Sequence, residues 1–155
     1  MKQFCHYGSH LDGSESVRLG IAVALIDESD RLLLELRSDV LLWGLTGGRL
    51  DPGETPLECG CREVLEETGI QLQPCQLKFF GIYADPKDGR ILQYPDNRIH
   101  LLDIIFTAKV SSEFHLILSS ESKDLKFFSA EYLPSTIVPP AVRPISDLVS
   151  TGSLQ

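Results

Sequence analysis

TPLECGCREVLEETG, residues 55–69, decides the fold, because it carries the signals for both ends of one helix. Thr55 is a natural N-cap, Pro56 fits the first helical position, and Glu58 completes a capping box with Thr55. Gly69 fits the left-handed position that follows a last helical turn. The sequence therefore predicts a helix between Pro56 and Gly69.

The predicted helix has one acidic face. At about 100° per residue, Glu63, Glu66 and Glu67 lie within about 100° of one another. The small residues Cys59 and Gly60 lie on the same face and leave room beside the carboxylates. The opposite, mostly apolar face is expected to be buried, and it consists of Leu57, Cys61, Val64, Leu65 and Thr68.

Two interpretations of the acidic face are open. Each like-charged pair costs about 0.2–0.5 kcal/mol, which a solvated surface helix can tolerate. Clustered carboxylates are also the oxygen ligands that a hard cation such as Mg²⁺ requires. A glycine-rich loop, residues 44–53, precedes the helix, and its backbone can approach a ligand closely. This loop favours a metal or ligand site.

The composition limits the classes of protein that the chain can belong to. Its 155 residues fit one domain, and 43% hydrophobic residues suit a globular protein. A net charge of −8 argues against a nucleic-acid polymer or an acidic membrane as partner. The four cysteines lack zinc spacing and are expected to be reduced thiols. The apolar runs are too short for a membrane span, and we expect a cytoplasmic protein.

The order of elements predicts an α/β layered domain. Residues 1–16 lack periodicity and are expected to form an N-terminal arm, and residues 17–155 a single domain. Strands are expected at 17–27, 31–37, 76–85, 100–110 and 124–130. Loops are expected at 43–54 and 86–98, and a short helix near the C-terminus.

The charged helix is part of a longer pattern. Residues 48–70 read GRLDPGETPLECGCREVLEETGI and match every fixed position of the Nudix box, from Gly48 to Ile70. WGLTGG before the box and ESKDLKFFSAEYLP after it also resemble segments of that family. The chain therefore resembles a Nudix hydrolase. The resemblance implies an α/β/α sandwich with a mixed β-sheet between helices.

The resemblance implies hydrolysis of the pyrophosphate bond of a nucleoside diphosphate linked to another group. An acidic protein can bind such a substrate only with the help of cations, and Mg²⁺, or alternatively Mn²⁺, suits oxygen ligands. Glu63, Glu66 and Glu67 are the predicted metal ligands, and the Gly48 carbonyl is added by the resemblance.

Other residues of the box have supporting roles. Arg62 is spaced to orient the carboxylates of Glu58 and Glu66. Glu54 is expected to brace the glycine-rich loop or to support Arg62. The general base is open among Glu63, Glu66 and a distant carboxylate, for which Glu121 is the best candidate by resemblance. The predicted catalytic set is Glu63, Glu66, Arg62 and Glu121.

The substrate is less constrained than the reaction. Within the family, a proline about 16 residues after the box accompanies activity on ADP-ribose, and Pro86 stands 86 − 70 = 16 residues after Ile70. An ADP-ribose-like substrate is therefore favoured. A nucleoside triphosphate is the alternative, followed by a non-catalytic nucleotide-binding module. Arg90, Arg98 and Tyr83 are the further predicted substrate contacts. The expected partner is a small nucleotide, and a homodimer remains open.

Overall fold

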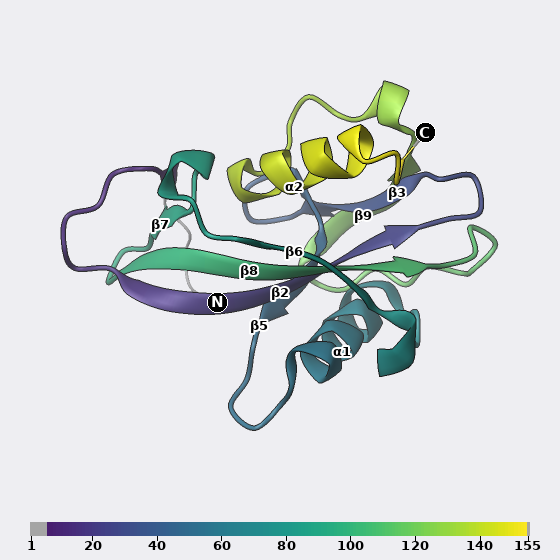
Figure 1. Cartoon of the computed structure of the whole chain (residues 1–155), viewed down its shortest axis with the longest axis horizontal. Helices are drawn as coiled ribbons and strands as arrows, with labels where there is room; N and C mark the ends of the chain where they lie inside the picture. Colours follow the sequence, from purple (N-terminus) through teal and green to yellow (C-terminus); the bar gives the residue numbers. More distant parts are fainter. Residues whose placement is uncertain (1–5, 155) are drawn as a thin grey trace.

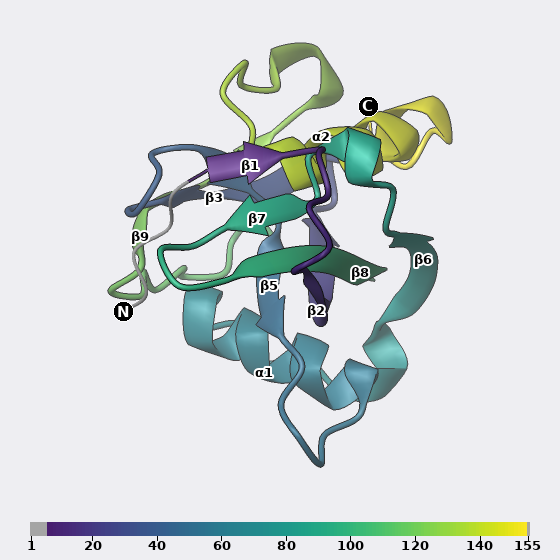
Figure 2. The same ribbon diagram turned by 90° about the vertical axis from the view of Figure 1, so that its left-hand side faces the viewer.

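The computed structural model describes residues 6–154 and shows a curled sheet between two helices (Figures 1 and 2). Within this range the strands are β1 (His6–Gly8), β2 (Ser16–Ile26), β3 (Leu32–Arg37), β4 (Trp43–Gly44), β5 (Thr46–Arg49), β6 (Lys78–Tyr83), β7 (Ile91–Gln93), β8 (Arg98–Lys109) and β9 (Ser122–Phe128). The helices are α1 (Pro56–Thr68), α2 (Pro139–Ser150) and the short 3₁₀ turns η1 (Pro74–Gln76), η2 (Pro86–Asp88) and η3 (Ala130–Tyr132).

Strands β2 and β8 form the centre of the sheet. They pair in parallel from Ser16↔Ile99 to Ile26↔Lys109, while β2 also pairs antiparallel with β3 and β5. The outer strands complete the order β1-β7-β8-β2-β3-β4, with β6 on β8 and β9 on β3. The sheet is therefore mixed, as predicted.

Each face of the sheet carries a hydrophobic core and one helix. Strand β2 is apolar along its buried half because both of its faces are covered. Ile21, Val23 and Leu25 point to the core beneath α1, and Ala24 and Ile26 to the core beneath α2. Helix α2 lies above the sheet and α1 below it (Figure 1), so the predicted α/β/α sandwich is confirmed.

The predicted ends of α1 are confirmed. Thr55 accepts a hydrogen bond from the Glu58 backbone N–H at 3.2 Å, and the Glu58 side chain accepts one from the Thr55 N–H at 2.9 Å. Gly69 has φ 79°, in the left-handed region that ends a helix. These local bonds determine where the helix starts and stops.

The predicted buried face of α1 is confirmed for Val64 and Thr68, which are fully buried, but the buried side is wider than predicted and excludes Leu65. Cys59, Gly60 and Glu67 are buried against the sheet, whereas Leu65 is 48% exposed. A Cβ atom on Gly60 would lie 2.8 Å from the Leu77 side chain. Gly60 is therefore small because the helix packs closely on its neighbours, and it leaves no space for a ligand.

Three segments that were predicted as loop or arm contain strands. Strand β5 lies in the glycine-rich loop and pairs with β2. Strand β7 lies in the predicted loop 86–98, and β1 in the predicted arm pairs with β7 (Figure 2). These strands are only three or four residues long, so their side chains show too little alternation of apolar and polar residues for a strand to be predicted from the sequence. Residues 1–5 of the predicted arm, Cys5 among them, lie outside the described residues.

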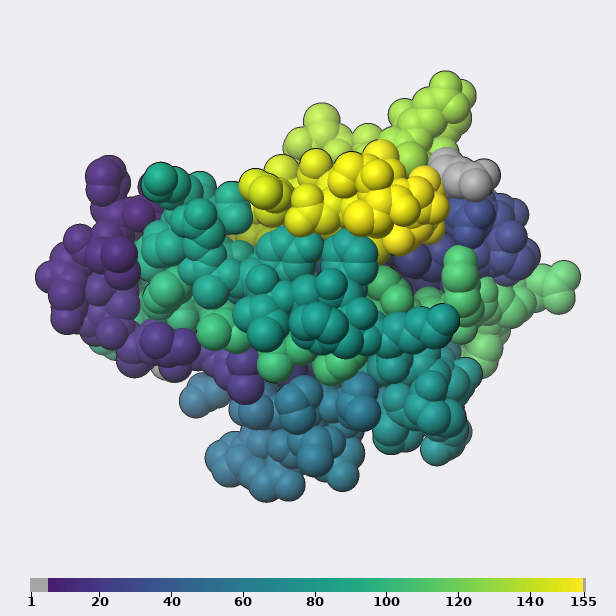
Figure 3. Space-filling view, viewed as in Figure 1, coloured from purple at the N-terminus to yellow at the C-terminus, as the bar shows by residue number. Residues whose placement is uncertain are grey.

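The space-filling view shows the N-terminal segment at one end of the molecule and α2 along its upper side (Figure 3). Among residues 6–154, every helix is too short or too polar to cross a lipid bilayer.

Gly47→Ala is expected to destabilise the protein, because the new Cβ would overlap the Ile21 carbonyl oxygen and lie 2.7 Å from the Ala22 Cα. Backbone atoms of β2 cannot move without breaking the β2–β5 pairing. Urea unfolding should give a free energy of unfolding lower by about 1–3 kcal/mol. Gly8→Ala is the control, because its Cβ would be 3.8 Å from the nearest atom. Equal stability of both variants would contradict this packing argument.

Candidate active site

Four glutamates and Asp39 line one cavity of about 460 Å³, called here the acidic cavity. Helix α1 contributes Glu63 and Glu67, β3 contributes Glu35, and the turn before β9 contributes Glu121. The backbone of β5 forms a further wall at Gly47 and Gly48. Pairing of β3 with β9 and packing of α1 on β5 bring together residues that lie far apart in the sequence.

Glu67 is the most deeply buried carboxylate of α1. It is 8% exposed and accepts a hydrogen bond from the Gly47 N–H at 3.0 Å. Glu35 is also buried and accepts a hydrogen bond from the Ser122 hydroxyl. Burial, and then the negative charge of Glu35, raises the pKa of Glu67 well above its ordinary value. Without a cation the uncharged form of Glu67 is therefore favoured, and a bound cation would favour its ionised form.

Glu63 lies directly against Gly48. A Cβ atom on Gly48 would be 2.7 Å from the Glu63 Oε2 atom, so a side chain at this position would displace the carboxylate. Burial raises the pKa of Glu63, while its hydrogen bond with Arg62 acts in the opposite direction. The structure therefore brings together two of the predicted metal-site residues.

Arg62 joins the glycine-rich loop to the helix. Its guanidinium donates to both carboxylate oxygens of Glu54, at 3.0 and 2.7 Å, and to Glu63 Oε1 at 2.8 Å. Glu54 in turn accepts a hydrogen bond from the Asp51 N–H at 2.8 Å, and the Arg62 hydrogen bond lowers the pKa of Glu54 to about 2. Glu54 therefore both braces the loop and supports Arg62. The predicted contact with Glu58 was wrong, because Glu58 closes the capping box instead.

Glu66 and Glu121 occupy different positions relative to the acidic cavity. The Glu66 side chain is 58% exposed, lies 3.4 Å from Arg62 and is outside the cavity lining. The reason is that α1 turns its Glu63–Glu67 side towards the sheet and its Glu66 side towards solvent. Glu121 lines the cavity, and the backbone of its turn is held by a hydrogen bond from the Ser38 N–H at 2.9 Å.

The acidic cavity provides oxygen donors suited to Mg²⁺ or Mn²⁺. Within residues 6–154, no three His, Cys, Asp or Glu side chains converge into a finished metal cluster. The donors are instead spread along the wall. The raised pKa of Glu67 is caused first by burial and then by the charge of Glu35, and a cation bound beside it would oppose both effects. The donor chemistry therefore fits a hard divalent cation.

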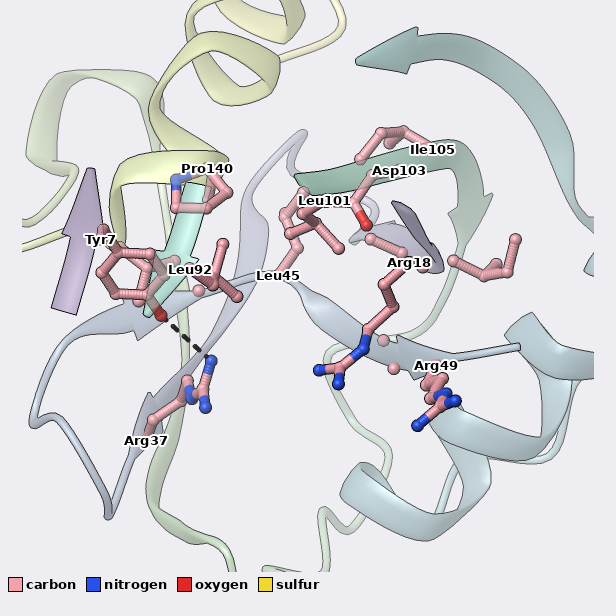
Figure 4. Close-up of a pocket in the computed structure, with 18 residues that line it drawn as sticks. Tyr7, Arg18, Arg37, Leu45, Arg49, Leu92, Leu101, Asp103, Ile105 and Pro140 are labelled. Carbon is pink, nitrogen blue, oxygen red and sulfur yellow. Dashed lines mark hydrogen bonds between the residues drawn. The ribbon is translucent and has the colours of Figure 1, made fainter. Parts of the chain in front are cut away.

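Several charged residues of the site were missed by the sequence analysis. Arg18, Arg37 and Arg49 lie where the acidic cavity meets a second cavity (Figure 4). Glu35 is a buried acid in the apolar strand β3. A charged residue that interrupts a buried strand is unusual and could have been detected as a candidate functional residue.

The second cavity, called here the apolar cavity, has a volume of about 210 Å³ and lies beneath the start of α2. Its apolar walls are Leu45, Leu92, Leu101, Ile105, Val138, Pro140 and Ala141. Tyr7 of β1 closes one side, and its hydroxyl accepts a hydrogen bond from Arg37 Nη1 at 3.3 Å (Figure 4). The two cavities share Gly47, Gly48 and the three arginines, so they form one continuous site.

The four predicted substrate contacts lie elsewhere in the described part of the chain, outside the linings of both cavities. Arg90 is fully buried and paired with Asp103. Arg98 binds Glu15 and so holds the segment before β2.

The other two predicted contacts serve the packing of α2 and a local turn. The Tyr83 hydroxyl donates to Asp147 of α2 at 2.8 Å, and Pro86 begins the turn η2. The sequence does not show whether a residue in a predicted loop is exposed to solvent. Tyr83, Arg90 and Arg98 are therefore predicted from sequence as substrate contacts, whereas in the structure each is paired with another residue of the chain.

Comparisons with known proteins agree with this architecture. A family model described as NUDIX domain matches residues 17–148. A putative 8-oxo-dGTP diphosphatase of Bacillus subtilis is 36% identical over 128 residues, which cover 83% of this chain and 77% of the relative. An ADP-ribose pyrophosphatase of Methanocaldococcus jannaschii is 31% identical over 113 residues, covering 71% of this chain and 61% of the relative.

A solved structure of similar fold is described as a MutT NUDIX hydrolase from Burkholderia pseudomallei. It has a TM-score of 0.68 and 23% sequence identity, and the match covers 85% of this chain and 98% of that chain. This likeness shows that the two chains share a fold.

Without divalent cations, the free energy of unfolding is expected to rise as the pH falls from about 8 to about 5. Burial raises the pKa values of Glu35, Glu63 and Glu67 in the folded protein, so the folded state binds more protons than the unfolded chain in this window. Stability is then lost as the pH rises. The pKa of Glu54 is lowered to about 2, so its contribution to the free energy of unfolding is constant in this window and is lost only at lower pH.

Urea unfolding in EDTA at several pH values measures this slope. Glu67→Gln replaces the titrating carboxyl by an uncharged amide, so the free energy of unfolding should depend less on pH. Glu113→Gln, in an exposed turn, should leave the pH dependence unchanged. A slope that is identical in wild type and Glu67→Gln would contradict the assignment.

Proposed function

The chain belongs to the Nudix family of pyrophosphohydrolases, and from this premise we propose which bond it cuts and which residues act. The proposed reaction is hydrolysis of a pyrophosphate bond in a nucleotide, assisted by Mg²⁺ or Mn²⁺. The observation that carries the proposal is the common cavity of Glu63, Glu67, Glu121 and the Gly48 backbone.

The proposed cation ligands are the Gly48 carbonyl, Glu63 and Glu67, and the exposed Glu66 would have to turn towards the cavity to join them. A divalent cation bound there would neutralise phosphate charge and lower the pKa of a bound water. Gly48 supports this proposal because it lacks a Cβ that would displace the Glu63 carboxylate. Arg62 would keep Glu63 oriented through its 2.8 Å hydrogen bond.

The proposed chemical step is in-line attack of water on phosphorus. A carboxylate accepts one proton from the water, a new P–O bond forms, and the bond to the leaving phosphate breaks with its electron pair. Glu63 and Glu121 are the two candidates for this base. Burial raises the pKa of Glu63, which makes its carboxylate a better proton acceptor near neutral pH.

The arginines at the junction of the two cavities are proposed phosphate contacts. Guanidinium groups bind phosphate through paired N–H donors. Arg37 is held by Asp39, at 3.1 and 2.6 Å, and by the Tyr7 hydroxyl, which fixes its guanidinium near the carboxylates. The acidic walls and these cations together suit a substrate whose phosphates carry a metal ion.

A nucleoside triphosphate is the better-supported substrate class. The ADP-ribose expectation depended on Pro86, which lies outside both cavities. The apolar cavity is smaller than the roughly 300–1,000 Å³ of sites for whole drug-sized ligands, and it suits one ring system. The name of the Bacillus subtilis relative points to a triphosphate, while that of the archaeal relative keeps ADP-ribose as the second candidate.

Glu63→Gln and Glu67→Gln are each expected to lower kcat by at least about 100-fold, because each removes a proposed charged ligand. The assay is release of phosphate or nucleoside monophosphate from a panel of nucleoside triphosphates and ADP-ribose with Mg²⁺ or Mn²⁺. Circular dichroism confirms that the variants are folded.

Glu113→Gln is the matched control and should retain wild-type activity, since Glu113 lies in an exposed turn outside the acidic cavity. Full activity of both cavity variants would refute the proposed ligands. Absence of wild-type turnover on every member of the panel would refute the proposed reaction.

A further inference from the structure

The apolar cavity contains one carboxylate among its lining residues in the described chain, that of Asp103 on β8. Leu101 and Ile105 lie on the same face of β8, one on each side of Asp103, and the carboxylate points between them into the cavity (Figure 4). The Asp103 side chain is 16% exposed. A carboxylate in an apolar pocket is costly unless it is paired, so its environment needs an explanation.

Gly20 makes room for this carboxylate. It faces Asp103 across the parallel pairing of β2 and β8. A Cβ atom on Gly20 would overlap the Oδ1 atom of Asp103. Any other residue at this position would push Oδ1 out of its present location.

Arg90 holds the other oxygen. Its Nη1 atom donates to Asp103 Oδ2 at 2.9 Å, and its Nη2 atom donates to the Pro140 carbonyl at 2.7 Å. That carbonyl lacks a helical donor because Pro144, four residues later in α2, has no N–H. The buried Arg90 guanidinium is thus held by the Pro140 carbonyl and in turn holds the Asp103 carboxylate in place.

The remaining oxygen, Oδ1, receives no hydrogen bond from the residues that the structure describes. Burial raises the pKa of Asp103, and the Arg90 guanidinium opposes that shift by stabilising the ionised form. An ionised carboxylate only accepts hydrogen bonds. The apolar cavity therefore offers apolar walls and one fixed carboxylate, in which Oδ1 is free to accept hydrogen bonds and Oδ2 already accepts one from Arg90.

We infer that the apolar cavity binds the base of the nucleotide and that Asp103, positioned by Arg90, selects a guanine ring. This inference rests on the proposed function, because the phosphates would then lie at the three shared arginines and in the acidic cavity. Guanine presents two adjacent donors, N1–H and the 2-amino group, to a carboxylate. Adenine and cytosine place an acceptor nitrogen beside their amino group, and that nitrogen would repel Oδ1.

The unmodified protein tests this inference with dGTP, dITP and dATP. The base of dITP keeps N1–H and lacks the 2-amino group, so it removes one donor and changes little else. We expect kcat/KM for dGTP to exceed that for dITP and for dATP by about tenfold or more, because hydrogen bonds to charged groups are the strong ones. Values for dITP or dATP within about twofold of dGTP would overturn the inference.

Asp103→Asn tests the residue. Its dGTP-to-dATP ratio of kcat/KM should fall by about tenfold through a higher KM for dGTP, with kcat for dATP within about twofold of wild type. Asp124→Asn, on an exposed part of β9, is the matched control. An unchanged ratio in folded Asp103→Asn would overturn the inference. If this variant is unfolded, the comparison of dGTP with dITP on the wild type decides.

Binding of GMP and IMP to the metal-free wild type separates this inference from the proposed function. Calorimetry should show GMP bound about tenfold more tightly than IMP. Equal binding, or binding of neither nucleotide, refutes the base site even if hydrolysis occurs. Preferential GMP binding by a protein without turnover supports the base site and refutes the proposed reaction.

Discussion

The close approach of helix α1 to strand β5 is the constraint on which the site depends. Gly48 on β5 permits it, because a Cβ atom there would meet the Glu63 side chain, and Gly60 lets α1 pack closely against Leu77 and Val23. This approach buries Glu67 far enough to bond the Gly47 N–H. A helix one side chain farther from the sheet would leave the carboxylates in solvent, with ordinary pKa values and weak mutual repulsion.

Burial explains how an acidic protein can handle phosphate. Burial makes ionisation of the cavity carboxylates unfavourable, and the charge of Glu35 adds to this effect, so the pKa of Glu67 is raised. On the solvent side, the positive charge of Arg62 balances part of the carboxylates' negative charge through its ion pairs with Glu54 and Glu63. The proposed cation would favour the ionised form of the buried carboxylates and balance part of the charge of the substrate.

The two cavities connect the two layers of the fold. Strands β2 and β8 carry the apolar cavity on the α2 face, while β5 and α1 carry the acidic cavity. Arg90 couples the apolar cavity to α2 through the carbonyl that Pro144 leaves without a donor. Pro144 and the buried Arg90 therefore compensate for each other beside the apolar cavity, because the carbonyl that the proline leaves without a donor accepts a hydrogen bond from the arginine.

The sequence by itself determined the ends of α1, the longer strands and the family, because capping bonds, apolar periodicity and a spaced motif are local properties. It also determined Gly48, Glu63, Glu67 and Glu121 as candidates, and they share one cavity. Only the tertiary structure decided how far the buried side of α1 extends, since the sequence pattern placed Cys59, Gly60 and Glu67 on the open face. It alone placed Glu35, Asp103 and the junction arginines, and removed Arg90 from the surface, because strand pairing and burial depend on partners distant in the chain.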